Sequence, residues 1–325
     1  MKIKMEYVVL AALIVAISFY LVLRKTDRRL YQLPTIASVK AADISKIAIS
    51  HAGNTLNLVK KGDNWVVGEK DYPADAGKIK GLAESIAEFS VAALISESKN
   101  YPRYDLDADN RIGVKAWIGD KLCRDIYLGK ISSSYRHTFV MVAGDSRVYH
   151  AGGSLRNSFD LQLDDLRDKT VLAVHPEKLT RITLAQKDKT AVLTRETVTA
   201  ETKGDKTKSG TTGAADKTDS KTVVWKNSDG KIAGQKTIEA FLSGLKDLKC
   251  DHFIEAKPKE AFTAPVYTLT LEGDQKHVLK IFAKSNKEDN EFPAVSSDND
   301  YPFILSKWSA DRIMKDPDSL MKKTP

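Results

Sequence analysis

Alternating apolar residues mark the start of the folded part of the chain. Ile47 and Ile49 are followed by Leu56 and Leu58 with polar residues between them, which is the period of half-buried strands. An Ala-Gly-Asn turn separates the two pairs, and a Gly-Asp-Asn turn then leads into a short strand that carries Trp65. The pattern therefore predicts antiparallel strands at the beginning of the first domain.

The next apolar pattern has the spacing of a helix. Ile79, Leu82, Ile86 and Phe89 recur every three or four residues, so they form one stripe that can face a core. Asp75 precedes this stripe and is a candidate N-cap, because its carboxylate can accept hydrogen bonds from the first turn. We therefore predict a helix packed on the sheet.

This order of elements occurs a second time. The alternation returns from Leu179, the third strand resurfaces at Trp225, and a second helical stripe begins at Ile238. A duplication explains this repetition. We predict an α+β fold of two tandem repeated modules, 43–170 and 171–325, each an antiparallel sheet with a packed helix. Further strands are expected at 112–118, 122–128, 138–142, 266–272 and 277–283.

One segment of the second module breaks the correspondence. Residues 196–222 contain Val198 as their single large aliphatic residue, and their five acids balance their five lysines. Such a segment cannot bury enough apolar surface to order itself. A loop of this length is either functional or unstructured, and we expect a disordered insert.

The N-terminal region has a long apolar run. Residues 7–23 follow a tail at 1–6, precede a basic linker at 24–42, and have a length that suits a transmembrane anchor. A cleaved signal peptide is the alternative. The absence of an Ala-x-Ala-type cleavage site favours an uncleaved anchor.

Charge is concentrated in the same region. Residues 1–42 hold seven Lys and Arg against two acids, whereas 43–169 hold 18 of each sign, within a net charge of +8. This balance argues against nucleic acid, which requires a basic stripe on a folded domain. The basic residues after the apolar run favour a cytoplasmic body, whereas the short basic tail before it is typical of exported proteins.

The sequence shows no catalytic motif and no local metal-binding face. We expect no catalytic residues, no cofactor and no metal ligands. Cys123 and Cys250 are interpreted as two separate thiols, and a disulfide between them stays open. No two histidines have the three- or four-residue spacing of a metal face on a helix; they are His51, His137, His150, His175, His252 and His277.

Three other groups invite a functional interpretation and are better explained structurally. Asp105–Arg111 begins like a calcium loop, but Asn110 stands where that loop needs glycine. The charged residues of 164–169 are expected to form a salt-bridged connector. Trp65 and Trp225 precede equivalent helix stripes, so core packing is favoured over ligand stacking.

Seven short motifs follow one another in a fixed order: ISKIAI at 44–49, GDNW at 62–65, YPAD at 72–75, YDLD at 104–107, LGK at 128–130, VY at 148–149 and LRDK at 166–169. In this order they resemble the bacterial DUF4340 proteins, a family named for a domain of unknown function. One motif departs from the family pattern, since Asp105 stands where the family's YGLD motif has glycine.

The resemblance implies a membrane-anchored protein that accompanies gliding-type ABC transport components. It implies a single-pass protein of the bacterial inner membrane, with an extracytoplasmic body. The expected partners are membrane lipid, contacted through residues 7–29, and integral membrane transporter subunits. We expect a non-enzymatic accessory protein of an envelope assembly; the alternative is an envelope polysaccharide-binding protein or hydrolase.

Overall fold

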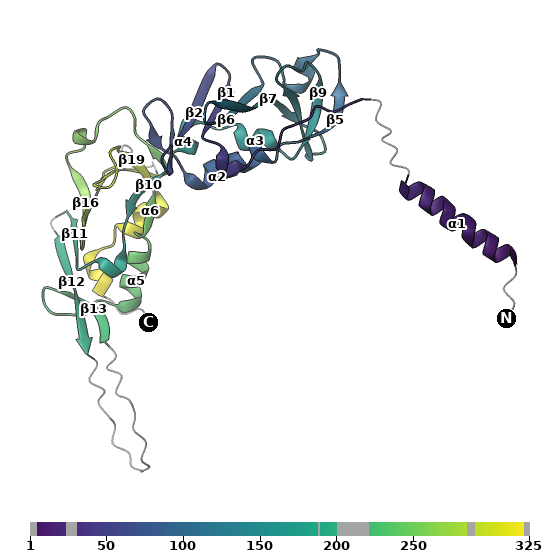
Figure 1. Cartoon of the computed structure of the whole chain (residues 1–325). Coiled ribbons are helices and arrows are strands. Elements are labelled where there is room, and N and C mark those ends of the chain that lie inside the picture. Colours follow the sequence, from purple (N-terminus) through teal and green to yellow (C-terminus); the bar gives the residue numbers. More distant parts are fainter. Residues whose placement is uncertain (1–4, 24–30, 188, 200–220, 285–289, 322–325) are drawn as a thin grey trace, which may run out of the picture. The chain divides into compact units, whose positions relative to one another are not determined.

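The computed structural model describes residues 5–23, 31–187, 189–199, 221–284 and 290–321 (Figure 1). The chain divides into two compact units, Met1–Gln162 and Leu163–Pro325. The repeat in the sequence predicts the boundary between the two modules after Thr170. Each unit is sheet-rich with a few helices, so the α+β class with antiparallel sheets is confirmed.

Helix α1 spans Met5–Leu23. Large apolar side chains between Val9 and Tyr20 are exposed, for example Val9 at 58%, Val15 at 67% and Phe19 at 64%. Among the described residues, no helix combines the length and apolar content that crossing a membrane requires.

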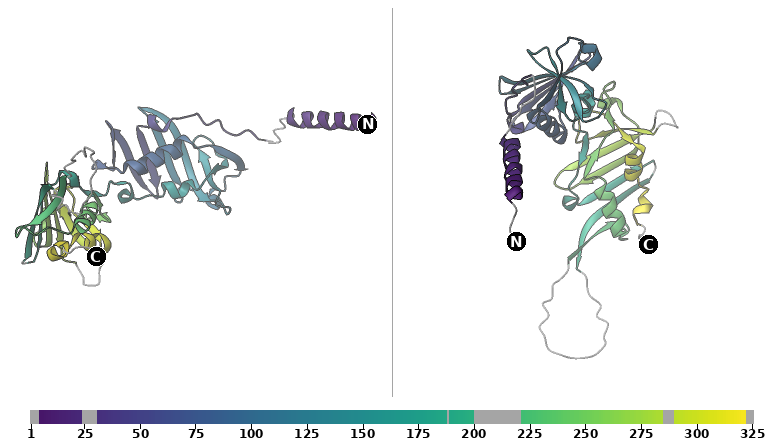
Figure 2. Two further views of the ribbon diagram at one scale, coloured as in Figure 1. Left: turned by 90° about the horizontal axis from the view of Figure 1, so that it is seen from below. Right: turned by 90° about the vertical axis from the view of Figure 1, so that its right-hand side faces the viewer.

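Unit 1 contains an antiparallel sheet (Figures 1 and 2). Its described strands follow the order β4-β3-β2-β1-β6-β7-β8-β9-β5. The order is not sequential, because β6 lies beside β1 and β5 closes the far edge. The strands are β1 Lys46–His51, β2 Asn54–Lys61, β3 Asn64–Val67, β4 Tyr72–Pro73, β5 Val91–Ser96, β6 Ile112–Ile118, β7 Lys121–Ile131, β8 His137–Val142 and β9 Val148–Gly152.

The first hairpin forms as its alternation predicts. Ile47 pairs with Leu58 and Ile49 with Leu56, so the four apolar side chains lie on one face. Gly53 completes the turn with a φ of +82°, a conformation that glycine adopts at little cost. The opening pattern is therefore a β1–β2 hairpin in the core of unit 1.

Helix α2, Ala76–Ala87, follows β4 and has the predicted cap. The Asp75 carboxylate accepts hydrogen bonds from the backbone N–H of Gly77 at 2.9 Å and of Lys78 at 3.1 Å. Ile79 and Ile86 are buried on the stripe that faces the core. The short helix α3, Leu155–Phe159, contacts β6, β7 and β8.

A second apolar cluster of unit 1 lies around the 3-10 helix η2, Tyr101–Tyr104. Tyr104 and Leu106 pack with Met141 of β8 and Val148 of β9. Gly129 of β7 lies beneath this segment, where a Cβ would clash with the Tyr104 carbonyl oxygen. The close approach requires glycine at position 129.

Unit 2 contains a second antiparallel sheet, with the order β13-β12-β11-β16-β17-β18-β19-β15 among its described strands. A separate ribbon pairs β10 with β14. The strands are β10 Thr170–Ala173, β11 Arg181–Gln186, β12 Lys189–Thr199, β13 Lys221–Asn227, β14 Asp247–Lys249, β15 His252–Phe253, β16 Pro265–Glu272, β17 Lys276–Phe282, β18 Glu291–Ser296 and β19 Phe303–Ser306.

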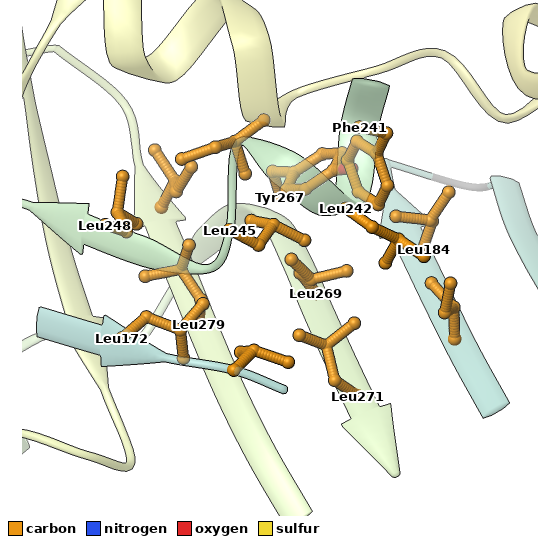
Figure 3. Close-up of a cluster of buried hydrophobic side chains, with 14 of the residues drawn as sticks. Leu172, Leu184, Phe241, Leu242, Leu245, Leu248, Tyr267, Leu269, Leu271 and Leu279 are labelled. Atoms are coloured by element: carbon orange, nitrogen blue, oxygen red, sulfur yellow. The ribbon is translucent and has the colours of Figure 1, made fainter. Parts of the chain in front are cut away.

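The core of unit 2 lies between this sheet and its helices (Figure 3). Helix α5, Gln235–Ser243, directs Phe241 and Leu242 toward Tyr267 and Leu269 of β16 (Figure 3). Helix α6, Lys307–Ile313, contacts β18 and β19. The helix stripe predicted after Trp225 is thus a core stripe.

Remaining short elements connect these parts. They are the helix α4, Leu163–Leu166, and the 3-10 helices η1 Ala41–Asp43, η3 Pro176–Lys178, η4 Lys259–Ala261 and η5 Pro317–Met321.

The expected insert at 196–222 needs a correction at its edges. Residues 196–199 continue β12, and 221–222 begin β13, with Glu196 opposite Val224 and Thr199 opposite Lys221. Most of these residues are polar, but their backbone hydrogen bonds to the neighbouring strand hold them in an ordered conformation. Residues 200–220 lie outside the described part of the chain.

Candidate functional site

Unit 2 has a polar cavity of about 310 Å³ at one end of its sheet. The turn between β16 and β17 forms one wall, and the segment around η3 forms another. Asp274 pairs with Lys178 across the cavity, with 3.3 Å between the carboxylate oxygen and Nζ. The lining residues are Ala173, His175, Lys178, Leu179, Gly273, Asp274, Gln275 and His277.

One imidazole in this cavity is oriented by a carboxylate. Nδ1 of His277 lies 2.7 Å from Oδ2 of Asp298, and Asp298 accepts a second hydrogen bond from Ser297 Oγ at 2.7 Å. The His277 side chain is only 13% exposed. A carboxylate at Nδ1 favours the tautomer whose proton is on Nδ1, which leaves Nε2 as an acceptor.

A second imidazole borders the same cavity. His175 lies 3.5 Å from Glu177, and both side chains are largely exposed. An imidazole held by a carboxylate can transfer a proton or accept a hydrogen bond from a ligand. The nearby hydroxyl of Ser297 donates to Asp298 and not to His277, so these three residues do not form a Ser-His-Asp relay.

No motif in the sequence indicates this cavity. His175, His277 and Asp298 come from three distant segments, and their spacing matches no motif. Only the pairing of β17 with β18 brings His277 and Asp298 together, through the hydrogen bond from Ser297 N to the Val278 carbonyl oxygen.

The other histidines make separate contacts. His51 lies 3.2 Å from Asp160, and His252 lies 3.1 Å from Asp251. His137 and His150 stack with ring centroids 5.0 Å apart. Burial and the neighbouring His137 lower the pKa of His150. Within the described ranges, no three His, Cys, Asp or Glu side chains are grouped so that they could hold a metal ion.

The calcium-like loop is a compact turn before β6. Oδ1 of Asp107 accepts hydrogen bonds from the backbone N–H of Asp109 and Asn110 and from the Asn110 side chain, at 2.9–3.3 Å. Asp105 adopts φ +52° and ψ +39°. Glycine adopts this left-handed conformation at little cost, which explains why the family's YGLD motif has glycine at this position. Asp107 therefore stabilises the turn itself.

The charged residues of 164–169 form contacts with other parts of unit 2. Lys169 pairs with Asp164 at 2.8 Å, and its Nζ donates to the Asp251 carbonyl oxygen. Arg167 is 4% exposed and lies 3.8 Å above the ring of Phe253. Its guanidinium also pairs with Glu255 and contacts the face of Tyr301 at 4.9 Å. These contacts tie the connector to unit 2.

The two tryptophans differ in burial. Trp225 is 4% exposed and belongs to the core of unit 2, together with Ile238 and Phe241. Trp65 is half-buried and borders a hollow beside Ile79. Trp225 is therefore a core residue, as predicted, whereas Trp65 packs against the core with only part of its ring. Cys123 and Cys250 are both free thiols.

These features define a two-unit, sheet-rich α+β protein with a polar cavity in unit 2. A model of the family described as "Domain of unknown function (DUF4340)" matches residues 65–269. The match covers more than half of the chain, and the protein belongs to the DUF4340 family. The matched stretch begins in β3 of unit 1 and ends in β16 of unit 2, so it includes the junction between the units. No curated protein and no solved structure matches the chain.

Proposed function

We propose that the chain is a non-enzymatic, membrane-attached accessory protein of a bacterial envelope assembly, associated with an ABC-type transport system. The observation that carries the proposal is α1, an apolar helix with exposed side chains that is joined to two folded units. The short sequence motifs resemble those of proteins that accompany gliding-type transport components, and this resemblance supports a transport system as the assembly.

Attachment through α1 follows from its exposed apolar surface. The helix has 19 residues, which at 1.5 Å per residue is a length of about 28 Å, against a hydrocarbon thickness of about 30 Å. Val15 and Ile17 are 67% and 50% exposed and lie two positions apart, on opposite sides of the helix, so apolar side chains on more than one face are available to lipid. We propose that α1 is a single transmembrane anchor and that the body is extracytoplasmic, against the finding that no helix among the described residues has the length and apolar content to span a membrane.

The chain that follows α1 is fixed to unit 1. Arg124 on β7 is 5% exposed and donates to the Ala37 carbonyl oxygen at 2.7 Å and the Ile86 carbonyl oxygen at 3.2 Å. The Ile86 carbonyl lies at the C-terminal end of α2, where a positive charge is favourable. Arg124 thus limits the linker between the anchor and unit 1 to the residues before Ala37.

We propose that the body is a duplicated module. In support, the order β3-β2-β1-β6-β7-β8-β9-β5 in unit 1 can be aligned with β13-β12-β11-β16-β17-β18-β19-β15 in unit 2, which leaves β4 and the β10–β14 ribbon without counterparts. A helix follows the third strand of the aligned set in each unit, α2 and α5, and another follows β9 and β19. The anchor raises the effective concentration of both units near a membrane partner.

Purification of the tagged full-length protein in mild detergent tests the proposal. We expect polytopic membrane subunits and an ATPase to co-purify, and the fragment lacking residues 1–30 to recover much less of them. A fusion of alkaline phosphatase or a fluorescent protein to the C-terminus tests the location of the body. Recovery of the full-length protein alone after crosslinking would reject the accessory function.

The polar cavity supports the second candidate, an envelope polysaccharide-binding protein or hydrolase. The Asp298-oriented imidazole of His277 could accept a proton or a ligand hydroxyl. Incubation with purified envelope polysaccharide, followed by reducing-end analysis and binding titration, tests this function. The hydrolase would lose activity in His277→Ala, whereas His252→Ala, on an exposed histidine outside the cavity, is the control.

A further inference from the structure

Unit 1 has an apolar hollow of about 350 Å³ between α2 and the strands β2 and β3, the second of which carries Trp65. Its floor includes Ile44 and Ile79, both 1% exposed, and Trp65 forms a half-buried wall. Small side chains leave the space open, since Ala41, Ala42, Ala76 and Ala83 complete the apolar lining. A volume near 300 Å³ is the lower end of the range of ligand pockets in proteins.

Unit 2 has a larger side chain at the position that corresponds to Ala83. Helix α5 follows Trp225 as α2 follows Trp65, and aligning the apolar stripes of the two helices puts Leu242 at the place of Ala83. Leu242 belongs to the same buried cluster as Trp225, which is 4% exposed. Ala83 thus lines the hollow at a position where, on this alignment, unit 2 has the larger side chain of Leu242.

The rim of the hollow carries a net positive charge. Lys60 lies directly opposite Trp65 in the β2–β3 ladder. Lys80 on α2 is the second cation, and it lies 3.9 Å from Glu84, the one acid of the rim. An occupant with apolar side chains for the interior and carboxylates for the rim would match both chemistries.

The rest of this chain does not supply such an occupant. In the segments outside the described residues, the large apolar side chains are Met1, Ile3 and Leu30, and each of these lies next to a lysine or arginine. These neighbouring basic residues have the same sign of charge as the rim. The occupant therefore comes from another molecule.

We propose that the Trp65 hollow docks a segment of a partner protein that presents one or two large apolar side chains flanked by carboxylates. The inference rests on the proposed accessory function and specifies where unit 1 contacts its partner. Lys60 and Lys80 attract the acidic flanks, and Trp65 and Ile79 cover the inserted side chain, the composition expected of an interaction hot spot.

Two variants separate docking from folding. Ala83→Leu fills the hollow with the side chain that unit 2 uses, so it should block docking while unit 1 keeps its melting temperature. Lys80→Glu reverses a rim charge and should weaken binding of an acidic segment. Lys121→Glu, on an exposed lysine of β7 away from the hollow, is the control.

The probe is a dye-labelled hexapeptide with a Leu-Phe pair between two pairs of glutamates, titrated against full-length protein in detergent. We expect Ala83→Leu and Lys80→Glu to weaken its binding at least tenfold, and a peptide with lysines in place of glutamates to bind at least tenfold more weakly. Equal affinity of the wild type and Ala83→Leu, or equal affinity of the acidic and basic peptides, would overturn the proposal.

Crosslinking in native membranes tests the same site with its natural partner. A photoreactive benzoylphenylalanine in place of Glu84, the rim acid, keeps both rim lysines and should crosslink to an acidic, apolar protein segment, and Ala83→Leu should remove the product. Crosslinks to lipid or glycan alone, or crosslinks that Ala83→Leu leaves intact, would overturn the docking site. If the wild type recovers transporter subunits and Ala83→Leu recovers them equally, the docking site fails and the accessory function stands.

Discussion

The carbonyl oxygen of Tyr104 lies so close to the α-carbon of Gly129 that a Cβ at position 129 would collide with it. This contact joins two of the motifs that resemble the family, YDLD at 104–107 and LGK at 128–130. The glycine of the LGK motif thus leaves the space into which the turn of the YDLD motif packs.

Gly129→Ala should therefore destabilise unit 1. The added methyl group would displace Tyr104 and Leu106 from the cluster with Met141, and overpacking of this kind costs about 1–3 kcal/mol. Urea denaturation measures the loss. Gly152→Ala is the matched control, since a Cβ there meets nothing within 4 Å; equal stability of the two variants would contradict the close approach.

Asp105 tests the turn that precedes this contact. Its left-handed conformation costs an ordinary residue about 1–2 kcal/mol, more for a β-branched side chain and least for glycine. We expect Asp105→Gly to keep or raise the free energy of unfolding and Asp105→Val to lower it. The thermal midpoints of the two variants check this order, and the reverse order would exclude the left-handed turn.

The tryptophans should differ in their contribution to stability. Trp225→Ala should cost about 3–5 kcal/mol because the buried ring leaves a cavity in the core of unit 2. Trp65→Ala should cost less, because the half-buried ring already borders an open hollow. Calorimetry of both variants measures the difference, and equal losses would show that Trp65 is a core residue.

Asp145 should make unit 1 sensitive to acid. Arg147 donates hydrogen bonds to both carboxylate oxygens, and these hold the pKa of Asp145 well below its usual value near 4. Because the folded pKa is lower than the unfolded one, this stabilisation is present above about pH 4 and is lost as the pH falls further.

Denaturation curves at a series of pH values check this linkage. The wild type should lose more stability than Asp145→Asn between about pH 5 and pH 2, because the variant has no carboxylate to protonate. Asp120→Asn, in an exposed turn, should follow the wild type. Parallel pH profiles for the wild type and Asp145→Asn would refute the role of the ion pair.

The two cysteines should react as separate thiols. Burial, together with the nearby Asp164, raises the pKa of Cys250 to about 12, and burial also raises the pKa of Cys123. Because the thiolate is the reactive form, native Cys250 should resist a thiol reagent at pH 8. Non-reducing denaturation should release two titratable thiols per chain, and their absence would indicate a disulfide.

The sequence alone determined the elements whose signals are local. Alternation at Ile47, Ile49, Leu56 and Leu58 predicted the first hairpin, since one face of that hairpin is buried. Asp75 predicted the start of α2, since a cap depends on residues two and three positions away. The order of short sequence motifs predicted the family, and the match over residues 65–269 confirms it.

Tertiary structure decided the features that depend on distant segments. Val91–Ser96 has no clean alternation and becomes a strand only by pairing with β9, through two irregularities in register. The ends of the insert become ordered because β12 and β13 extend their ladder into it. His277 meets Asp298 only when β17 and β18 align, and the hollow beside Trp65 forms only where η1, β2, β3 and α2 come together. Local sequence patterns do not encode such contacts, because each needs the chain to close a long loop before its side chains meet.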